Sequence, residues 1–368
     1  MKGYRKMKKV LSVILSLLMF ASVFTAFCAA EEESDSNSIT VKFLNCNVAG
    51  LPDFKSLIGQ ESTDVKGNSK QLGAKFNSSD IDVIAVQEDF NYHRFLTGEM
   101  KNYKYSTNHT GGVPGGDGLN IYTRNIPIYN EARQEWHSCY GGIAEGDALT
   151  PKGILYTVLD LGNGITVDFY DIHADAFDGN GNALSRAAQY LQLLTLVGEN
   201  SADRPVILTG DFNTSIHFNY GGENSADEEM MYDLTDKYGF KDAWIETNNN
   251  GNYDDFSEWK KLYPNSYWGI WDSVEKFYYR SGGGIEINPV DFEYFVTENE
   301  NGESLSDHNG AVCNFTFTKT DSFTEDTREL TVTRQGLFAK FISTVRWIFK
   351  DLVFIFRDHF DELIGFIK

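Results

Sequence analysis

Cysteine is scarce in this sequence of 368 residues, and the pattern does not form a disulfide framework. There are four cysteines, and Cys46, Cys139 and Cys313 are left once the N-terminal apolar segment described below is removed. An odd, sparse set of thiols excludes the small disulfide-stapled domains, even in an oxidising compartment. Cys46 and Cys313 lie in strand-like runs, which favours buried thiols over a bridge. Stability must therefore come from a hydrophobic core.

Positive charge is scarce as well. The chain has 32 Lys and Arg residues against 53 Asp and Glu residues, a net charge of −21. Strong acidity keeps a protein soluble and argues against a broad surface that binds nucleic-acid phosphates. It does not exclude a nuclease, because a local metal site can attract a phosphate despite the global charge.

The first 30 residues have the composition of a secretory signal. Five basic residues precede an apolar run over residues 10–27, and the small residues Cys28-Ala29-Ala30 follow. This pattern predicts a secreted protein cleaved after Ala30, with a net charge of −26 because five positive charges leave with the signal. A retained anchor helix is the alternative, since about eighteen apolar residues nearly span a bilayer. The bulky Phe27 before Cys28 disfavours a lipoprotein.

Short apolar runs that end in polar residues recur along the chain and predict strands. Runs such as Val83–Val86 are apolar at every position, which is typical of strands covered on both faces. Leu184–Val197 repeats apolar residues at helical spacing, and Asn182 is predicted to cap its start. The pattern indicates an α/β protein with helices outside buried sheets. The predicted strands are Thr40–Leu44, Ile81–Gln87, Leu119–Tyr122, Gly153–Leu161, Ile165–Ile172, Val206–Thr209, Phe292–Thr297 and Gly310–Thr316.

Three segments depart from this pattern. Residues 31–38 are an acidic linker and residues 318–335 a polar one. Residues 220–284 are loop-rich and aromatic, too long for a simple connection; they are interpreted as a functional insertion or as padding of a small subcore. Residues 336–368 repeat apolar side chains at helical spacing, interrupted too often by charges for a membrane span. That amphipathic helix is expected on a membrane surface, on a partner helix or on the main domain.

Polar side chains flank the predicted strands at five places, and these places carry the chemistry. In layered α/β folds the carboxyl ends of strands bind ligands, because side chains emerge there from rigid supports into a shared crevice. A carboxylate at the end of a buried strand must find a cation or shift its pKa. The five stretches are Asn45-Cys46-Asn47-Val48, Gln87-Glu88-Asp89, His173-Ala174, Gly210-Asp211-Phe212-Asn213 and Leu305-Ser306-Asp307-His308.

In this order and combination, the five motifs resemble those of the endonuclease/exonuclease/phosphatase superfamily, the DNase I-like proteins. Lesser matches are Gly118–Arg124 and the pair of Arg186 and Gln189. The resemblance runs from about residue 40 to 317, which defines a catalytic domain over residues 39–317. It implies a four-layered α/β/β/α sandwich, with two mixed β-sheets face to face and helices outside. It also implies an enzyme that hydrolyses phosphate esters with a divalent metal ion.

The resemblance assigns a metal role to three residues. Glu88 corresponds to the main ligand of a Mg²⁺ (or Mn²⁺) ion, a hard cation that prefers carboxylate and water oxygens. Asn47 is expected to help hold the metal or the phosphate, although Asn45 stands only two residues away. Asp307 completes the acidic cluster. Phosphoryl transfer needs mainly positioning and charge neutralisation, which such a set supplies.

Four further residues correspond to catalytic groups of the family. His308 resembles the residue that activates the attacking water, and His173 the one that contacts the phosphate and aids the leaving oxygen. Asp211 and Asn213 are expected to orient the nucleophile and stabilise the developing charge. The carboxylate that orients the second histidine lies in an Asp-Tyr strand in the family. Here Asp291 is favoured for that role, with Glu293 as the alternative.

The substrate is expected to be a lipid phosphodiester. The stretches around Arg124 and Lys152 are similar to the sphingomyelinase-like branch of the superfamily. The aromatic segment over residues 220–284 and the tail over residues 336–368 suit a lipid interface. Strong negative charge disfavours anionic lipid, so a zwitterionic headgroup fits better. The alternatives are a secreted nuclease, which predicts basic loops beside the site, a phosphomonoesterase, and a binding module that has lost catalysis. The sequence says nothing about oligomeric state.

Overall fold

The structure is a computed structural model that describes residues 37–52, 63–141, 150–214, 225–253 and 274–332. The predicted signal over residues 1–30 and the predicted amphipathic helix over residues 336–368 lie outside these residues. Within them, no helix is both long enough and apolar enough to cross a membrane.

Two mixed six-stranded sheets form the centre of the domain. The first sheet has the order β11-β12-β1-β2-β4-β3 and the second the order β5-β6-β7-β8-β10-β9. Each contains one parallel pair, β1 with β2 and β7 with β8. The strands are β1 Ser38–Asn47, β2 Val83–Gln87, β3 Tyr105–Ser106, β4 Asn120–Thr123, β5 Ile128–Glu135, β6 Gly153–Gly162, β7 Ile165–His173, β8 Val206–Asp211, β9 Lys241–Asp242, β10 Glu275–Arg280, β11 Ile285–Phe295 and β12 Gly310–Lys319.

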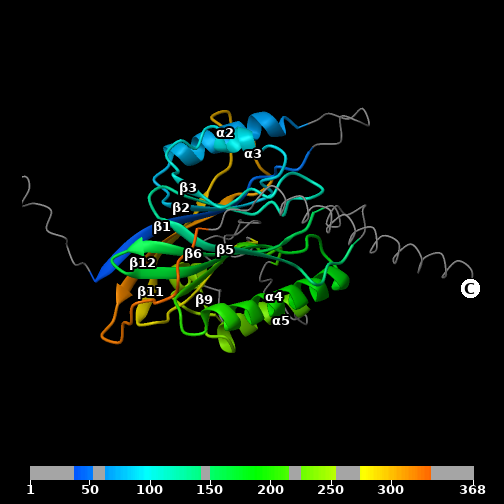
Figure 1. Cartoon of the computed structure of the whole chain (residues 1–368). Coiled ribbons are helices and arrows are strands. Elements are labelled where there is room, and N and C mark those ends of the chain that lie inside the picture. Colours follow the sequence, from blue (N-terminus) through cyan, green and yellow to red (C-terminus); the bar gives the residue numbers. More distant parts are fainter. Residues whose placement is uncertain (1–36, 53–62, 142–149, 215–224, 254–273, 333–368) are drawn as a thin grey trace, which may run out of the picture. The chain divides into compact units, whose positions relative to one another are not determined.

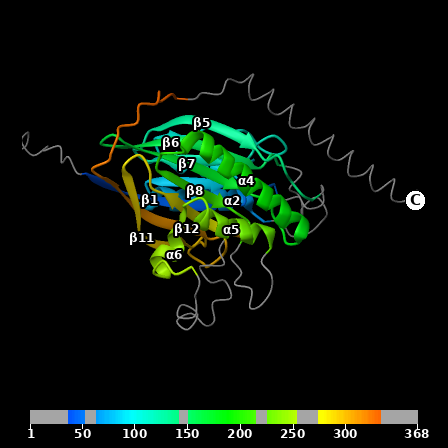
Figure 2. The same cartoon turned by 90° about the horizontal axis from the view of Figure 1, so that it is seen from below.

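Helices cover the outer face of each sheet. In Figure 1, α2 and α3 lie on the side of the first sheet and α4 and α5 on the side of the second, and Figure 2 shows α4 running across β6 and β7. The arrangement confirms the predicted four-layered α/β/β/α sandwich. The helices are α2 Val65–Ser78, α3 His93–Thr97, α4 Asn180–Ser201, α5 Ala226–Asp236 and α6 Ala243–Asn248.

Three apolar clusters fill the three interfaces between these layers. The cluster between the sheets includes Phe43, Phe169 and Phe315, and the ring of Phe43 stacks on that of Phe169 at 5.6 Å. A second cluster joins β7 and β8 to α4 through Tyr170 and Tyr190. The third joins the first sheet to α2. Three cores for four layers leave both sheets covered on both faces, which explains their continuous apolar runs.

The alternation of side chains along the strands determines where the site forms. On β7, residues 165, 167 and 169 belong to the cluster between the sheets, and residues 170 and 172 to the cluster under α4. Because side chains alternate with a period of two, Asp171 and His173 continue the row that faces the other sheet. Asn45 and Asn47 likewise continue the row of Val41 and Phe43 on β1. The space between the sheets therefore changes from apolar to polar at one end.

Several local predictions need correction. Helix α4 begins two residues earlier than its predicted cap, so Asn182 lies inside the helix and Gly179 is the N-cap. The segment over residues 220–284 is not an insertion in its described parts, because it supplies α5, β9, α6 and β10, and β10 pairs with β8. Nor are its described aromatics a separate subcore: Trp244 belongs to the cluster between the sheets. Its turn-rich composition hid these short elements.

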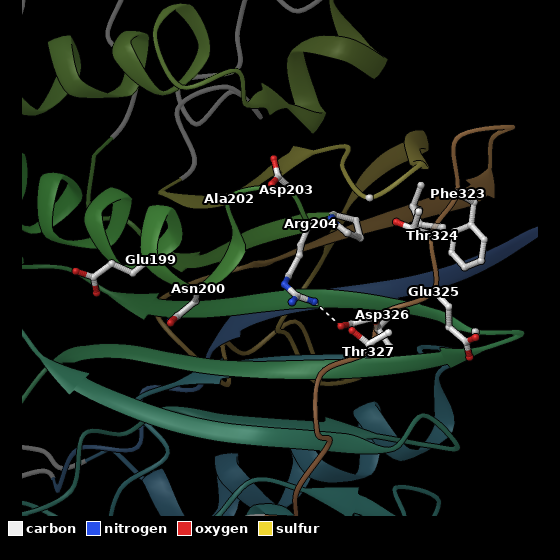
Figure 3. Close-up of a pocket in the computed structure, with 15 residues that line it drawn as sticks. Glu199, Asn200, Ala202, Asp203, Arg204, Phe323, Thr324, Glu325, Asp326 and Thr327 are labelled. Atoms are coloured by element: carbon white, nitrogen blue, oxygen red, sulfur yellow. Dashed lines mark hydrogen bonds and ion pairs between the residues drawn. The ribbon is translucent and has the colours of Figure 1, made fainter.

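The predicted polar linker after β12 is attached to the domain over its described part. Arg328 Nη2 donates to the buried Asp168 at 2.7 Å, and Arg204 pairs with Asp326 at 2.5 Å. Beside this pair lies a cavity of about 390 Å³ (Figure 3), lined by residues next to the starts of β7 and β8, such as Thr166 and Pro205, and by the tail residues 323–327. That cavity opens at the opposite end of the strands from the polar rows described above. It is a feature of the attached tail, separate from the candidate site.

Candidate active site

A buried layer of polar side chains joins the two sheets directly beneath the site. Gln87 Nε2 donates to Asn45 Oδ1 at 2.8 Å and to Asp171 Oδ1 at 2.6 Å, and Asn45 Nδ2 donates to the Gly210 carbonyl at 2.8 Å. Burial raises the pKa of Asp171 well above its ordinary value, which favours the protonated carboxyl. The layer shows that Asn45 has a structural role and that Asn47, one step further along β1, is the residue at the site.

Gly210 makes this close approach of strands possible. Its φ is +135°, and a Cβ atom there would lie 2.1 Å from the Ile172 carbonyl oxygen on β7. A side chain would push β7 and β8 apart just where their ends deliver His173 and Asp211, which are register partners. Glycine is thus required at position 210 by the packing of the neighbouring strand.

Asn47 links two carboxylates that come from different sheets. Its Nδ2 group donates to Glu88 Oε1 at 3.2 Å and to Asp211 Oδ2 at 3.1 Å. Its own Oδ1 accepts from the Ala49 amide at 3.0 Å, which fixes the orientation of the side-chain amide. Asn47, Glu88 and Asp211, predicted from separate motifs, therefore lie together.

Glu88 is a carboxylate that needs a cation. It stands at φ +59° directly after β2, an uncommon conformation for a residue with a side chain. Burial raises its pKa, the charge of Lys152 and the hydrogen bond from Asn47 lower it, and the charge of Asp307 raises it again. Carboxylate oxygens are the ligands that a hard divalent ion prefers, and here they come from Glu88, because Asn47 turns its Nδ2 group toward it. Asp307 itself is exposed and acts on Glu88 through charge.

Asp211 lies between the two predicted histidines. His173 Nε2 is 3.5 Å and His308 Nε2 4.0 Å from Asp211 Oδ2. Burial, followed by the charges of Lys152 and His308, holds the pKa of His173 well below its usual range, so His173 is a neutral imidazole. Its Nδ1 atom is buried without a hydrogen-bond partner among the described residues. His173 can therefore donate or accept one hydrogen bond, but it is not a source of positive charge.

Glu275, at the start of β10, is the carboxylate that orients His308. Glu275 Oε1 accepts from His308 Nδ1 at 2.5 Å. Because a carboxylate only accepts, the proton sits on Nδ1 and the neutral imidazole presents its Nε2 lone pair. Burial by itself lowers the pKa of His308, but the charge of Asp211 and the bond to Glu275 outweigh it and raise the pKa to about 10. A cation at Glu88 opposes that rise.

The prediction that Asp291 or Glu293 orients His308 is therefore wrong. Asp291 is exposed on β11 and accepts from the Asn314 side chain at 2.9 Å, and Glu293 is an exposed partner of Lys42 at 3.7 Å. A shift in the register of β11 and β12 between Pro289 and Asp291 accompanies this placement. The sequence signal for Glu275 was weak, a single acid before the apolar run Phe277–Tyr279.

Two more residues complete the site. Asn213 lies beyond the end of β8, at φ +51°. Its backbone amide donates to Asp211 Oδ1 and its Nδ2 group to the Ala174 carbonyl, each at 3.0 Å. Lys152 was not predicted as a site residue. Its buried Nζ donates to the same carbonyl at 3.2 Å, and its charge acts on Glu88, His173 and Asp211. In the sequence, Lys152 is marked only by its position just before a buried strand, β6.

Two groups of side chains in the described residues have metal-ligand composition, Asp211 with Glu275 and His308, and Asp89 with His93 and His109. In the first group, His308 Nδ1 is hydrogen-bonded to Glu275, so Glu275 serves to orient His308. In the second, the imidazole rings stack at 3.8 Å with an angle of 12°. A metal ion bound by a histidine lies near the plane of its imidazole ring. One ion cannot lie in the planes of two stacked, nearly parallel rings, so His93 and His109 do not bind it together. The oxygen set around Glu88 fits a metal better.

Comparison with known proteins gives the family. Residues 44–280 match the Endonuclease/Exonuclease/phosphatase family. The chain belongs to this family. Its members are phosphoric ester hydrolases that use divalent metal ions, and the geometry around Glu88, Asp211 and His308 is consistent with that chemistry. The match includes four of the five predicted motifs; the fifth, with Asp307 and His308, lies beyond residue 280.

Curated relatives are the sphingomyelinases of Mycobacterium bovis and Mycobacterium tuberculosis, each 31% identical over 295 residues, which is 77% of this chain and 54% of theirs. The chain spans about half the length of these relatives. Among solved structures, sphingomyelinase C from Streptomyces griseocarneus is 17% identical, with 75% of this chain and 99% of that chain covered and a TM-score of 0.50. D. rerio TDP2 complexed with a single strand DNA product is 16% identical, with 75% and 98% covered and a TM-score of 0.54. These two likenesses show the fold alone.

Proposed function

We propose that this protein hydrolyses the phosphodiester of a zwitterionic phospholipid of the sphingomyelin type, with Mg²⁺ or Mn²⁺ bound at Glu88. The observation that carries the substrate is the 31% identity to proteins named sphingomyelinase over 77% of this chain. The family and the site support ester hydrolysis but leave the ester open. The net charge of −21 disfavours a polyanionic nucleic acid and an anionic lipid as substrates.

Glu88 and Asp307 would hold the metal, which would neutralise charge on the phosphate. Asn47 would orient Glu88 or donate to the phosphate through its Nδ2 group. The remaining residues handle the proton and the geometry. His308 Nε2 accepts a proton from the attacking water, because Glu275 keeps the other ring nitrogen protonated. Asp211 orients that water between the two histidines, and the neutral His173 hydrogen-bonds to a phosphate oxygen. Lys152 adds a positive charge that comes from a side chain and not from the bound metal ion.

The proposed reaction is an in-line displacement at phosphorus. The water oxygen forms a bond to phosphorus, and the bond from phosphorus to the lipid alcohol oxygen breaks. The proton taken by His308 is returned to solvent, and the departing alkoxide takes a proton to become an alcohol. For a sphingomyelin-type substrate the products are a phosphorylated headgroup and a neutral lipid alcohol.

A substrate panel tests this proposal. The purified chain is assayed with sphingomyelin, phosphatidylcholine, phosphatidylinositol phosphates, plasmid DNA and RNA, each with Mg²⁺ and with EDTA. We expect Mg²⁺-dependent release of phosphocholine from sphingomyelin and at least about tenfold lower turnover of the nucleic acids. Faster cleavage of DNA or RNA would replace the lipid proposal by a nuclease. Absence of metal-dependent turnover on every substrate would refute an active phosphoesterase.

We also propose that the protein is exported and cleaved after Ala30. The support is the order of a basic segment, an apolar run and small residues at the start of the chain. Expression of the full chain in a secreting host, followed by mass measurement of the protein in the medium, tests it. A mature chain that begins at Glu31 is expected. A chain that stays with the membrane fraction with residues 1–30 attached would show a retained anchor instead.

A further inference from the structure

Four large apolar side chains stand in solvent around the mouth of the candidate site. Leu51 is 38% exposed, Tyr140 and Phe177 are each 53% exposed, and Leu184 is 63% exposed. Single exposed apolar residues are ordinary on protein surfaces, so their number alone decides nothing. Their position is informative, because each lies in a segment that follows a strand end of the site or that contacts such a segment. We call these four residues the apolar rim.

Leu51 and Phe177 come from opposite sheets and lie on two sides of the site. Leu51 follows Gly50, whose amide donates to the Glu88 carbonyl at 3.1 Å. Phe177 lies four residues after His173, in the loop that leaves β7. The loops after β1 and β7 both start at the polar end of the space between the sheets. An exposed leucine and an exposed phenylalanine therefore follow the two strand ends that carry Asn47 and His173.

Phe177 is held in an unfavourable backbone conformation that keeps its ring outside. Its φ is +67°, an outlier for a bulky residue. The Phe177 carbonyl accepts a hydrogen bond from Arg186 Nη1 at 2.7 Å. Arg186 Nη1 also donates to the Asp175 carbonyl at 3.1 Å. Arg186 is in turn held by Asp227 at 2.7 Å. Strain retained by a buried arginine, with an aromatic ring left in water, indicates a use for that ring.

Tyr140 and Leu184 extend the rim from Phe177 onto the first turns of α4. The Tyr140 amide donates to Asp175 Oδ2 at 2.8 Å. The Tyr140 ring covers Gly181, where a Cβ atom would lie 2.3 Å from it. Leu184 is one helical turn beyond Gly181, on the same face. These contacts hold Tyr140 between the loop of Phe177 and the first turns of α4.

Along α4 and in the described parts of the rim loops, no positively charged side chain is exposed. From Asn180 to Gly198, α4 carries one charged residue, Arg186, and that side chain is buried. The nearest exposed charges in the rim loops are negative, Asp178 and Asp307. An anionic membrane would be repelled by such a surface, and a basic protein partner would find no acidic patch along α4. A neutral surface that accepts aromatic and leucine side chains fits best.

We infer that the apolar rim inserts into the surface of a zwitterionic phospholipid bilayer and brings the site against the headgroups. This inference rests on the proposed phospholipid substrate. Insertion of Leu51 and Phe177 on two sides of the mouth places a headgroup phosphate between Glu88 and His308. Tyr140 and Leu184 enlarge the inserted area on one side, so the domain is held with its strand ends toward the lipid.

The test uses the full chain and a double variant, Phe177→Asn with Leu184→Gln. Asn tolerates positive φ, and Gln is a good helix former, so both loops keep their shape. The matched control is Leu191→Gln. Leu191 is 52% exposed on the same helix, seven residues and about 10 Å further from the mouth. All three proteins carry the same residues 333–368, so any contribution of that segment cancels.

Three measurements are made on each protein: sedimentation with phosphatidylcholine vesicles, hydrolysis of sphingomyelin in those vesicles, and hydrolysis of the soluble diester bis(p-nitrophenyl) phosphate. The double variant is expected to bind vesicles at least about tenfold more weakly and to lose a similar factor on embedded lipid. Turnover of the soluble diester should stay within about twofold, because the rim contacts no catalytic side chain. The control should match the unaltered chain.

Equal vesicle binding by the double variant would overturn the inference, and so would equal weakening by the Leu191→Gln control. A change in molecular mass instead of vesicle binding would identify the rim as a contact between copies of the chain, which also overturns it. The outcomes separate from those of the proposed function. If the unaltered chain hydrolyses neither ester, the function fails, while the vesicle comparison still tests the rim.

Discussion

Replacement of His308 by Ala is expected to lower kcat by roughly a thousandfold, the usual contribution of a positioned general base. The residue offers the only imidazole among the described residues that is held by one carboxylate and faces a second, Glu275 at 2.5 Å and Asp211 at 4.0 Å. KM should change little, since the lost interaction forms with the attacking water. Steady-state kinetics on the active ester measure both values. Full activity of the variant would refute the assignment.

Glu275→Gln tests the orienting pair without removing the base. Glu275 raises the pKa of His308, so its neutralisation lowers that pKa. The base must be unprotonated to accept a proton, and activity therefore rises with pH through the pKa of His308. The acidic limb of the pH profile should move to lower pH in the variant, and kcat should fall about tenfold or more as orientation is lost.

Asp291→Asn is the matched control for Glu275→Gln. Asp291 is exposed and bonded to Asn314, so its neutralisation should leave kcat and the pH profile unchanged. A shift of the profile in Asp291→Asn, with none in Glu275→Gln, would restore the carboxylate that the sequence favoured and would contradict the contacts described here. Profiles of kcat/KM against pH for the three proteins decide between the two carboxylates.

Glu88→Gln is expected to remove metal-dependent activity, with a loss of roughly a thousandfold at any usable Mg²⁺ concentration. The amide keeps the size of the side chain and can still accept from Asn47, which contacts Oε1 at 3.2 Å. What changes is the charge, the property that attracts a hard cation. Titration calorimetry with Mg²⁺ should show binding to the unaltered chain and weaker or no binding to the variant.

Asp307→Asn gives the graded comparison for Glu88→Gln. Asp307 is exposed and reaches Glu88 by charge, so its loss should weaken Mg²⁺ binding less than the loss of Glu88. A variant at Glu88 that retains the Mg²⁺ dependence of the unaltered chain would show that the cation is held elsewhere. The group of Asp211, Glu275 and His308 would then be the next place to test.

The neutral state of His173 bears on how the leaving oxygen is handled. Burial lowers its pKa well below the usual range, so at neutral pH the ring lacks the second proton that an imidazolium would give to the leaving oxygen. Its buried Nδ1 atom and its contact with Asp211 suit a hydrogen bond to the phosphate. Of the two tasks expected of His173 from the family resemblance, the structure supports contact with the phosphate more strongly.

The predictable part of the site was the part carried by strands. Asn47, Glu88, His173 and Asp211 each end or follow an apolar run, and the parity of that run determines the face on which the side chain stands. The placement of Asn47 over Asn45 follows from the same alternation, since both face the second sheet and the one nearer the end reaches the mouth. The local pattern located these residues, and the family resemblance supplied their roles.

The less predictable part lay in short elements and in pairing between distant segments. The strand that starts at Glu275 pairs with β8, 64 positions earlier in register at Asp211, and its preceding residues have no strand-like pattern. Nothing local to Glu275 indicates that His308, on a different segment, lies 2.5 Å away. Asp291 and Glu293 matched a family position in sequence, but the irregular register of β11 and β12 leaves both exposed.

By itself the sequence determined an α/β fold and the polar residues at the strand ends, because apolar periodicity and polar strand ends are local properties of the chain. Its resemblance to the family implied the four layers and the roles of those residues. The tertiary structure alone decided which carboxylate orients His308, that Lys152 adds a buried positive charge, and that Leu51 and Phe177 flank the mouth. These three depend on distances between segments far apart in the chain, and such distances are set by how the two sheets pack.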